Sequence, residues 1–192
     1  LGKTEDYNRL MQFSQNYRNQ YNAEKGFFLP RNYDGSWIDL DDHSRNGLTE
    51  GSKWTYLFCV LQDIPGMIDM MGGEKAFSAK LDRNFEEDHY RHDNEPGHHY
   101  IYLYNYCNEP WKTQELARKH VRINYKNSPD GVNGNDDCGQ MSAWYLFSAM
   151  GFYPVTPGSN EFAIGAPQLP EIKIQLKDNE LTIKAENLSE EN

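Results

Sequence analysis

The sequence predicts a mainly α-helical protein that ends in a few β-strands, an order that fits part of a helical toroid followed by an incomplete β domain. Apolar residues recur at helical spacing in several segments before Gly151. Long loops rich in Gly, Pro, Asn and Asp separate these segments. After Pro154 the pattern changes to alternation, which is typical of strands. An orthogonal helical bundle would give the same helical periodicity, so both arrangements stay open.

In the N-terminal half, the spacing predicts a helix from Thr4 to about Glu24, with Thr4 as its cap. A turn-rich loop follows over residues 29–37. A second helix is expected to begin after Gly51 and to reach Asp63. Pro65 then suits the first turn of a short helix that Gly72 and Gly73 end.

In the C-terminal half, Phe77, Leu81 and Phe85 sit four residues apart and predict a further helix. More helices are expected over 100–106, 113–125 and 136–151, the last with Met141, Trp144, Tyr145 and Ser148 on its buried side. A hairpin is expected over 172–185, with its turn at Asp178 and Asn179. Residues 1–155 are therefore assigned to the partial toroid and residues 156–192 to the truncated β segment.

The composition narrows the class of protein. A chain of 192 residues suits one domain or a piece of one, and its net charge of −10 argues against nucleic-acid binding. No stretch approaches the roughly 20 apolar residues that span a bilayer. Three widely spaced cysteines form neither a disulfide framework nor a zinc motif. Aromatic residues, 14% of the chain, suit a sugar-binding cleft, although composition alone favours a tyrosine-rich helix core.

Glu50 belongs to the first of three clusters that could carry chemistry, the run TEGSKW. Here a carboxylate stands at the start of an aromatic-rich segment that includes Lys53 and Trp54. Beside apolar rings a Glu loses hydration and stays protonated as a general acid needs to be. A simple helix-end carboxylate is the alternative.

The second cluster is Arg91 to His99. Its Asp, Asn and Glu oxygens and loop carbonyls are the donors that calcium prefers, and zinc ranks lower because no HExxH spacing is present. A polar turn before the next helix would also explain it. The third cluster, Gly131 to Gln140, places Asp136 and Asp137 at an expected helix start, where one carboxylate could act as a general base. A doubled N-cap is the alternative reading.

Together the runs TEGSKW, HDNEPGHHYIYLYNY with PWKTQ, and GNDDCGQMSAWYLFSAMGFYPVTPGS resemble, in this order, the signature segments of glycoside hydrolase family 92. The resemblance extends from about Leu48 to Pro170. It implies a calcium-dependent exo-α-mannosidase that inverts anomeric configuration and degrades mannose-containing glycans such as N-glycans. It also implies an N-terminal β-sandwich packed on an (α/α)6 toroid, with the active site between them.

By that resemblance Glu50 matches the general acid and Asp137 the general base, with Asp136 beside it as a support or as a residue that exchanges roles with it. Lys53 and Trp54 of the first run are expected to contact substrate. His92 and Asp93 match the place of a His-Glu pair that reads the leaving sugar in α-1,2 enzymes. The second residue is Asp here, so α-1,2 specificity stays open.

Asn94 and Asp93, with carbonyls around them, match the calcium-binding stretch. The resemblance further implies an internal piece of a longer periplasmic or secreted bacterial enzyme, inactive without the missing β-sandwich. The chain itself carries no targeting signal that we recognise. A non-catalytic glycan-binding module is the main rival, although both carboxylates are present. A polysaccharide lyase is less consistent with the negative charge.

Overall fold

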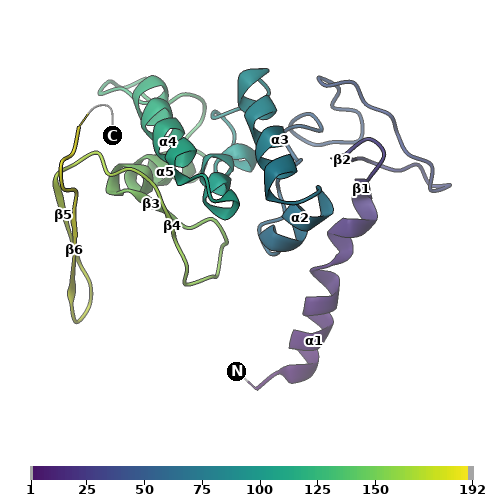
Figure 1. Cartoon of the computed structure of the whole chain (residues 1–192), viewed down its shortest axis with the longest axis horizontal. Coiled ribbons are helices and arrows are strands. Elements are labelled where there is room, and N and C mark those ends of the chain that lie inside the picture. The colour runs from purple at the N-terminus through teal and green to yellow at the C-terminus, as the bar shows by residue number, and fades with distance from the viewer. Residues whose placement is uncertain (1, 190–192) are drawn as a thin grey trace. The chain divides into compact units, whose positions relative to one another are not determined.

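The protein is described here by a computed structural model that covers residues 2–189 (Figure 1). It is mainly helical with small antiparallel strand pairs, which confirms the predicted fold class. The chain packs as two compact units, Leu1–Tyr90 and Arg91–Asn192, which we call unit 1 and unit 2. The division after Tyr90 does not test the predicted boundary at residue 155 between a toroid and a β segment. That boundary stays a prediction.

Unit 1 begins with helix α1 (Thr4–Phe13), which buries none of its residues. The helix ends 11 residues before the predicted end at Glu24, and Thr4 lies inside it, because Lys3 is the N-cap residue. Beyond Phe13 the chain turns, since the Ser14 hydroxyl donates to the Met11 carbonyl at 2.7 Å. A 3-10 helix (Asn16–Gln20) and the strand pair β1 (Tyr21–Asn22) and β2 (Phe27–Phe28) follow.

The helix predicted from Gly51 to Asp63 does not form. Successive turns occupy residues 53–58 instead. Side chains compete for the backbone groups that a helix would use: the Ser52 amide donates to Thr55 Oγ1 at 3.1 Å, and the Trp54 amide donates to Ser52 Oγ at 3.2 Å. The apolar spacing that suggested a helix instead places Trp54 and Leu57 in the core, where they are 1% and 0% exposed.

The Asp63 carboxylate links the segment after helix α1 to the start of the next helix. It caps helix α2 (Ile64–Met70) by accepting from the Gly66 amide at 3.0 Å, with Pro65 in the first turn as expected. The same carboxylate accepts from Tyr17 Oη at 2.8 Å and Gln15 Nε2 at 3.0 Å. Helix α3 (Glu74–Glu86) then packs Phe77 against Phe58, with ring centroids 5.2 Å apart.

Unit 2 contains two 3-10 helices, Glu95–Gly97 and Tyr100–Cys107, and helices α4 (Pro110–Asn124) and α5 (Gln140–Met150). The segment 100–107 is a 3-10 helix where an α-helix was expected. Residues 100–104 are all buried, so most of the segment lacks the polar side of an amphipathic helix, and its Tyr and Ile residues are poorer helix formers than Ala or Leu. Helix α5 begins four residues later than predicted and buries Met141, Trp144 and Ser148, whereas Tyr145 is 39% exposed.

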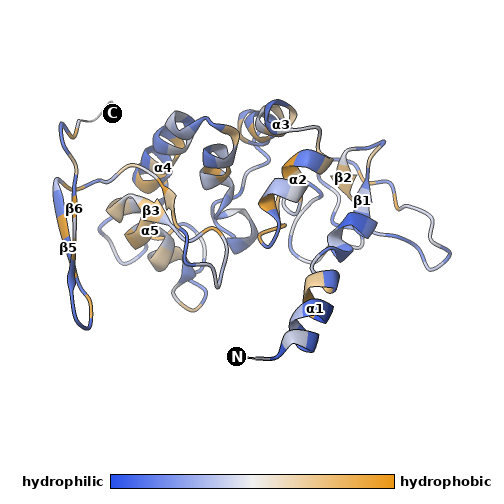
Figure 2. Ribbon diagram, turned by 60° about the horizontal axis from the view of Figure 1, so that its bottom comes forward, coloured by the Kyte–Doolittle hydropathy of each residue, from blue (hydrophilic) through white to orange (hydrophobic). Residues whose placement is uncertain are grey.

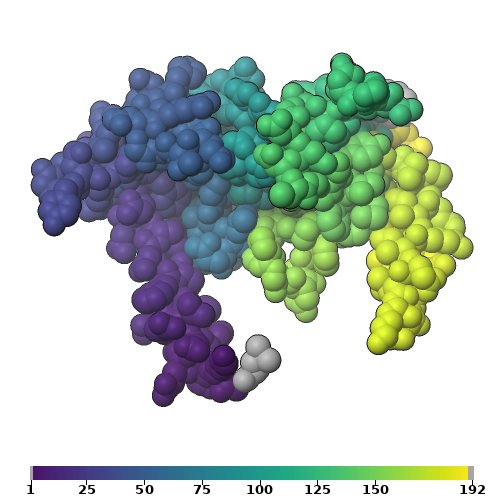
Figure 3. All heavy atoms as spheres, turned by 180° about the vertical axis from the view of Figure 1, so that it is seen from behind, coloured from purple at the N-terminus to yellow at the C-terminus, as the bar shows by residue number. Residues whose placement is uncertain are grey.

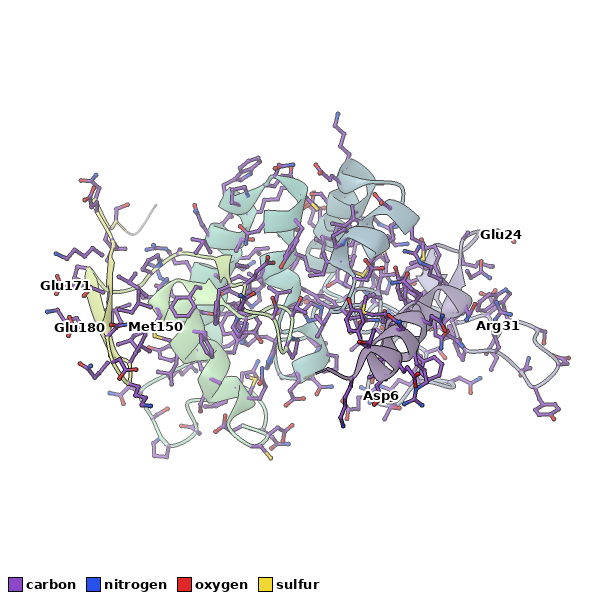
Figure 4. The ribbon with its side chains drawn as sticks, turned by 90° about the horizontal axis from the view of Figure 1, so that it is seen from below. Asp6, Glu24, Arg31, Met150, Glu171 and Glu180 are labelled. Atoms are coloured by element: carbon purple, nitrogen blue, oxygen red, sulfur yellow. The ribbon has the colours of Figure 1, made fainter. Side chains whose placement is uncertain are left out.

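Short strands complete unit 2. β3 (Phe152–Tyr153) pairs with β4 (Ala163–Ile164), and β5 (Glu171–Gln175) pairs with β6 (Glu180–Lys184) as the predicted hairpin. The hairpin stands away from the helices of its unit, and Glu171 and Glu180 lie on its neighbouring strands (Figures 3 and 4). Each sheet in residues 2–189 has two strands, so the larger sheet expected around this hairpin stays a prediction.

Replacement of Asp63 by Ala is expected to lower the free energy of unfolding by about 1–3 kcal/mol, because the change removes a helix cap and leaves a half-buried tyrosine hydroxyl without its acceptor. Asp69→Ala, an exposed position on the same helix, is the control and should stay within about 0.5 kcal/mol. Urea unfolding followed by circular dichroism measures both variants. Equal effects would contradict the central role of Asp63.

Candidate active site

Residues 131–139 belong to the loop between α4 and α5 and carry both predicted base candidates. We call this segment the catalytic loop after that predicted role. It is fastened to the end of α4 at Asn124. The Asn133 amide donates to the Asn124 carbonyl at 3.1 Å, and Asn133 Nδ2 donates to Asn124 Oδ1 at 2.9 Å. A bridge between Tyr125 and Val132 adds a second attachment. The two carboxylates are therefore presented from an anchored loop.

The structure gives Asp136 and Asp137 different surroundings. The Asp136 carboxylate accepts from the Ser142 amide at 2.8 Å and from the Ser142 hydroxyl at 3.0 Å. It therefore satisfies an amide in the first turn of α5, although the N-cap residue is Gly139 and the expected doubled cap does not form. Asp137 is exposed, and its carboxylate has no hydrogen bond or ion pair recorded within residues 2–189. Of the two, Asp137 is the carboxylate open to a water molecule or a ligand.

The backbone at this point is strained. Asp137, Cys138 and Gly139 have φ values of 41°, 58° and 89° in succession. Left-handed conformations disfavour residues with a Cβ, and they persist only where surrounding contacts hold them. The Asp136–Ser142 bonds lie directly beside the strained residues, which explains why α5 cannot begin before Gln140.

Gly134 brings the second cluster against the catalytic loop. A Cβ on Gly134 would lie 2.8 Å from the Asp93 carbonyl oxygen, so only glycine allows this approach. Asp93 itself is held by Arg91, whose Nη2 and Nε lie 2.6 and 3.0 Å from the two carboxylate oxygens. That hydrogen-bonded ion pair lowers the pKa of the Asp93 carboxyl. Two of the three predicted clusters therefore meet within unit 2.

His92, a predicted substrate contact, is buried among the described residues. It is 4% exposed, and Nε2 lies 3.0 Å from Tyr125 Oη. The Tyr125 hydroxyl donates its hydrogen bond to the Met141 carbonyl at 3.0 Å, so His92 Nε2 must be the donor to Tyr125. His92 thus positions the loop around Asp93, and its contact with a sugar stays a prediction.

Two more histidines pack around His92. Ring centroids of His98 and His120 lie 5.3 and 5.4 Å from that of His92. His98 Nε2 donates to the His92 carbonyl at 3.0 Å, and Asn124 Nδ2 donates to His120 Nδ1 at 3.0 Å. Burial lowers the pKa of His92 to about 2 and the pKa of His120 to about 4, and burial also lowers the pKa of His98. All three are neutral parts of the core.

The predicted calcium ligands supply part of a coordination shell. Asn94 is half-buried, and the Asp93 carboxylate is engaged by Arg91. Calcium takes 6–8 oxygen ligands, and no group of three or more His, Cys, Asp or Glu side chains in residues 2–189 is placed to hold a metal ion. Asn oxygens, backbone carbonyls and water are also calcium ligands, so the calcium site around Asn94 and Asp93 stays a prediction.

Glu50 lies in unit 1 in a bend, not at the helix end that was predicted. It is exposed, and its amide donates to Tyr56 Oη at 3.0 Å. The apolar shielding that a general acid requires is therefore not supplied by the described residues around it.

Lys53 and Trp54 are both packed inside unit 1. The Lys53 ammonium donates to the Leu40 carbonyl at 2.6 Å and pairs with Asp42 at 3.0 Å, and this bond lowers the pKa of the Asp42 carboxyl. The Lys53 ammonium also lies 4.8 Å from the centroid of the Phe27 ring. Trp54 is 1% exposed and stacks on His89 with centroids 4.4 Å apart, and its contact with a sugar stays a prediction. Its ring supports the turn that carries Lys53.

Tyr125, Ser142 and Gln140 were not identified from the sequence, although they hold the predicted site residues in place. Gln140 Nε2 donates to His98 Nδ1 at 3.2 Å. The only sequence signal was the position of Ser142 three residues into α5, where its amide needs an acceptor outside the helix.

Comparison with known proteins identifies the family. The sequence profile of the glycosyl hydrolase family 92 catalytic domain matches residues 1–192. This chain belongs to glycosyl hydrolase family 92. A family 92 α-mannosidase of Bacteroides thetaiotaomicron, also solved in complex with mannoimidazole, is 38% identical with a TM-score of 0.93 over 100% of this chain and 27% of that one.

Two other relatives agree with the family 92 assignment. A family 92 inverting mannosidase of Bacteroides thetaiotaomicron VPI-5482 is 34% identical, with a TM-score of 0.89 over 98% of this chain and 29% of that one. An uncharacterized secreted glycosidase of Arthroderma benhamiae is 28% identical over 91% of this chain and 26% of its own length. The family 92 chain thus spans between 26% and 29% of the length of these relatives. Over residues 2–189, no helix is both long and apolar enough to cross a membrane.

The histidine cluster predicts acid sensitivity for this family 92 chain. An unfolded chain binds protons on His92, His98 and His120 below about pH 6.5, whereas burial lowers the pKa of each of them in the folded chain. Stability is therefore complete above about pH 6.5 and falls as the pH drops toward 4, by at most about 1.4 kcal/mol per pH unit for each histidine.

Urea unfolding between pH 4.5 and pH 8 measures this slope. His120→Gln removes one of the three titrating groups and is expected to flatten the slope by about one third. A slope that is the same in the variant would exclude His120 as a contributor.

Proposed function

We propose that this chain carries the acid and base carboxylates of an exo-α-mannosidase that removes terminal α-linked mannose from glycans with inversion of configuration. The observation that carries the proposal is the division of roles in the catalytic loop. Asp136 binds the first turn of α5, while Asp137 is exposed on strained backbone. Membership of family 92, whose solved relatives include α-mannosidases, supports the substrate class.

In the proposed reaction Asp137 accepts a proton from water as the water oxygen attacks the anomeric carbon. Glu50 donates a proton to the glycosidic oxygen, the bond between that oxygen and the anomeric carbon breaks, and the leaving sugar departs as an alcohol. One water molecule is consumed, and the protons gained and lost by the two carboxyl groups re-equilibrate with solvent. Inverting enzymes hold such carboxyl groups roughly 6.5–9.5 Å apart.

The proposed site also needs parts outside the described residues. Glu50 is exposed here, and an apolar wall from a further domain would shield it. The N-terminal β-sandwich implied by the family resemblance is the proposed source of that wall. Lys53, whose side chain is 13% exposed, is the proposed sugar contact beside Glu50.

Calcium dependence and α-1,2 specificity are kept as separate parts of the proposal, since both rest on the family resemblance. Secretion or periplasmic location is also proposed, supported by the relative named as a secreted glycosidase. The rival function is glycan binding without hydrolysis.

Replacement of Asp137 by Asn is expected to lower kcat by about 10²–10⁴, because an amide cannot accept the water proton. Asp136→Asn is the matched control: its amide can keep both contacts with Ser142, so kcat should fall by less than about tenfold. The assay follows an aryl α-mannoside with the longest natural polypeptide that contains these 192 residues. Equal losses would refute the division of roles, and binding without any turnover would favour the glycan-binding module.

The 192-residue chain alone is expected to show no detectable mannosidase turnover, because correct positioning can supply roughly 7–11 kcal/mol of the barrier and the proposed wall is missing. The test uses an aryl α-mannoside with millimolar calcium, and Glu50→Gln excludes contaminating activity. Turnover that the Glu50→Gln variant loses would show that the chain holds a complete site.

Chelator is expected to abolish hydrolysis by the longest natural polypeptide, and added calcium should restore it, because the proposed ion shapes the substrate site. α-1,2-, α-1,3- and α-1,6-mannobiose compared in the same assay establish the linkage. Hydrolysis that persists in chelator would remove calcium from the proposal and leave the two carboxylates in place.

A further inference from the structure

Unit 2 contains a cavity of about 680 Å³ that the proposed reaction does not use. It lies between the end of α4, the turn over residues 126–132 and the outward face of α5. Ligand sites commonly have volumes of about 300–1,000 Å³, so this cavity is large enough for a sugar ring with its hydration. A backbone hydrogen bond holds this turn: the Lys126 amide donates to the Gly131 carbonyl at 2.8 Å.

Aromatic rings form one wall of the cavity. Tyr125 and Tyr145 have ring centroids 5.0 Å apart with planes tilted by 45°. Tyr145 is 39% exposed and its neighbour Leu146 is 58% exposed, although α5 is largely apolar (Figure 2). The buried side of α5 already holds Trp144 in the core, so Tyr145 and Leu146 form a second apolar face that opens on the cavity.

Polar groups surround this apolar wall. Lys126 and Asn127 are exposed and provide donors, and the amide oxygen of Asn127 is an acceptor. The Ser142 hydroxyl donates to Asp136 and keeps its lone pairs as acceptors toward the cavity. No carboxylate is among the residues that line it. Flat rings beside neutral and cationic donors suit the apolar face and the hydroxyl groups of an uncharged pyranose.

We propose that this cavity is a second sugar-binding site, which holds a sugar unit of the glycan other than the one that is cleaved. The choice of a mannose ligand rests on the proposed function. The site itself rests on the tyrosine wall and its polar rim. Ser142 lines the cavity and also binds Asp136 in the catalytic loop, so the cavity adjoins that loop. Asp137 is not among the residues that line the cavity.

The test uses the longest natural polypeptide that contains these residues, with Asp137→Asn to stop turnover and with carbon-13 labels on valine and leucine methyl groups. Methyl α-D-mannopyranoside is titrated while the resonances of Leu146 and Val132, both cavity residues, are followed. Saturable shifts of both resonances are expected. Tyr145→Ala should weaken binding about tenfold, and Tyr145→Phe, which keeps the ring, should weaken it less.

Trp111→Ala is the matched control, because Trp111 is 57% exposed at the other end of α4. It should leave the affinity unchanged within about twofold. Unmoved Leu146 and Val132 resonances, or the same affinity in Tyr145→Ala, would overturn the second site. The turnover assay of the polypeptide without Asp137→Asn tests the proposed hydrolysis separately, so failure of one proposal does not decide the other.

Discussion

The Tyr125 hydroxyl is the interaction on which the arrangement of unit 2 depends. It accepts a hydrogen bond from His92 and donates one to the Met141 carbonyl, so one side chain at the end of α4 joins the loop around Asp93 to the first turn of α5. Trp144 packs against the rings of both His92 and Tyr125, with centroids 4.3 Å and 5.9 Å from its own. Because His92 is buried, loss of its bond to Tyr125 leaves a buried polar group without that partner, which costs about 1–3 kcal/mol.

That fixed frame makes the strained catalytic loop tolerable. Left-handed residues such as Asp137 and Cys138 each cost on the order of 1–3 kcal/mol and survive where neighbouring contacts outweigh the cost. The contacts here are the Asp136 carboxylate on Ser142 and the close approach of Gly134 to Asp93. Asp136 and Asp137 therefore have complementary roles. The Asp136 carboxylate holds the backbone of the loop, and that backbone exposes the Asp137 carboxylate.

The sequence predicted the parts of this frame that depend on local pattern. Helix α3, helix α4 and the β5–β6 hairpin follow their apolar periodicity, and Pro65 marks the start of α2. The helix expected over 51–63 was wrong because Ser52 and Thr55 bind the backbone locally, which a count of apolar residues ignores. Periodicity also cannot distinguish a buried histidine from one that binds a ligand. The burial of His92 could not be foreseen for that reason, and Tyr125, 33 residues away, was missed because its role is a tertiary contact.

The two carboxylates of the proposed reaction differ in how much of their environment this chain supplies. A general base acts in its ionised form, which exposure to water favours, so Asp137 already has the surroundings that its proposed role needs. A general acid must hold its proton near neutral pH, which requires loss of hydration, and Glu50 is exposed on turns instead. Those turns are well supported from beneath, since Trp54 and Lys53 are fixed by His89 and Asp42. The turns that carry Glu50, the proposed acid, are thus fixed by their own contacts, but no apolar surface among the described residues shields its carboxylate. The proposed role requires such a surface over Glu50, not a rearrangement of the residues that support the turns.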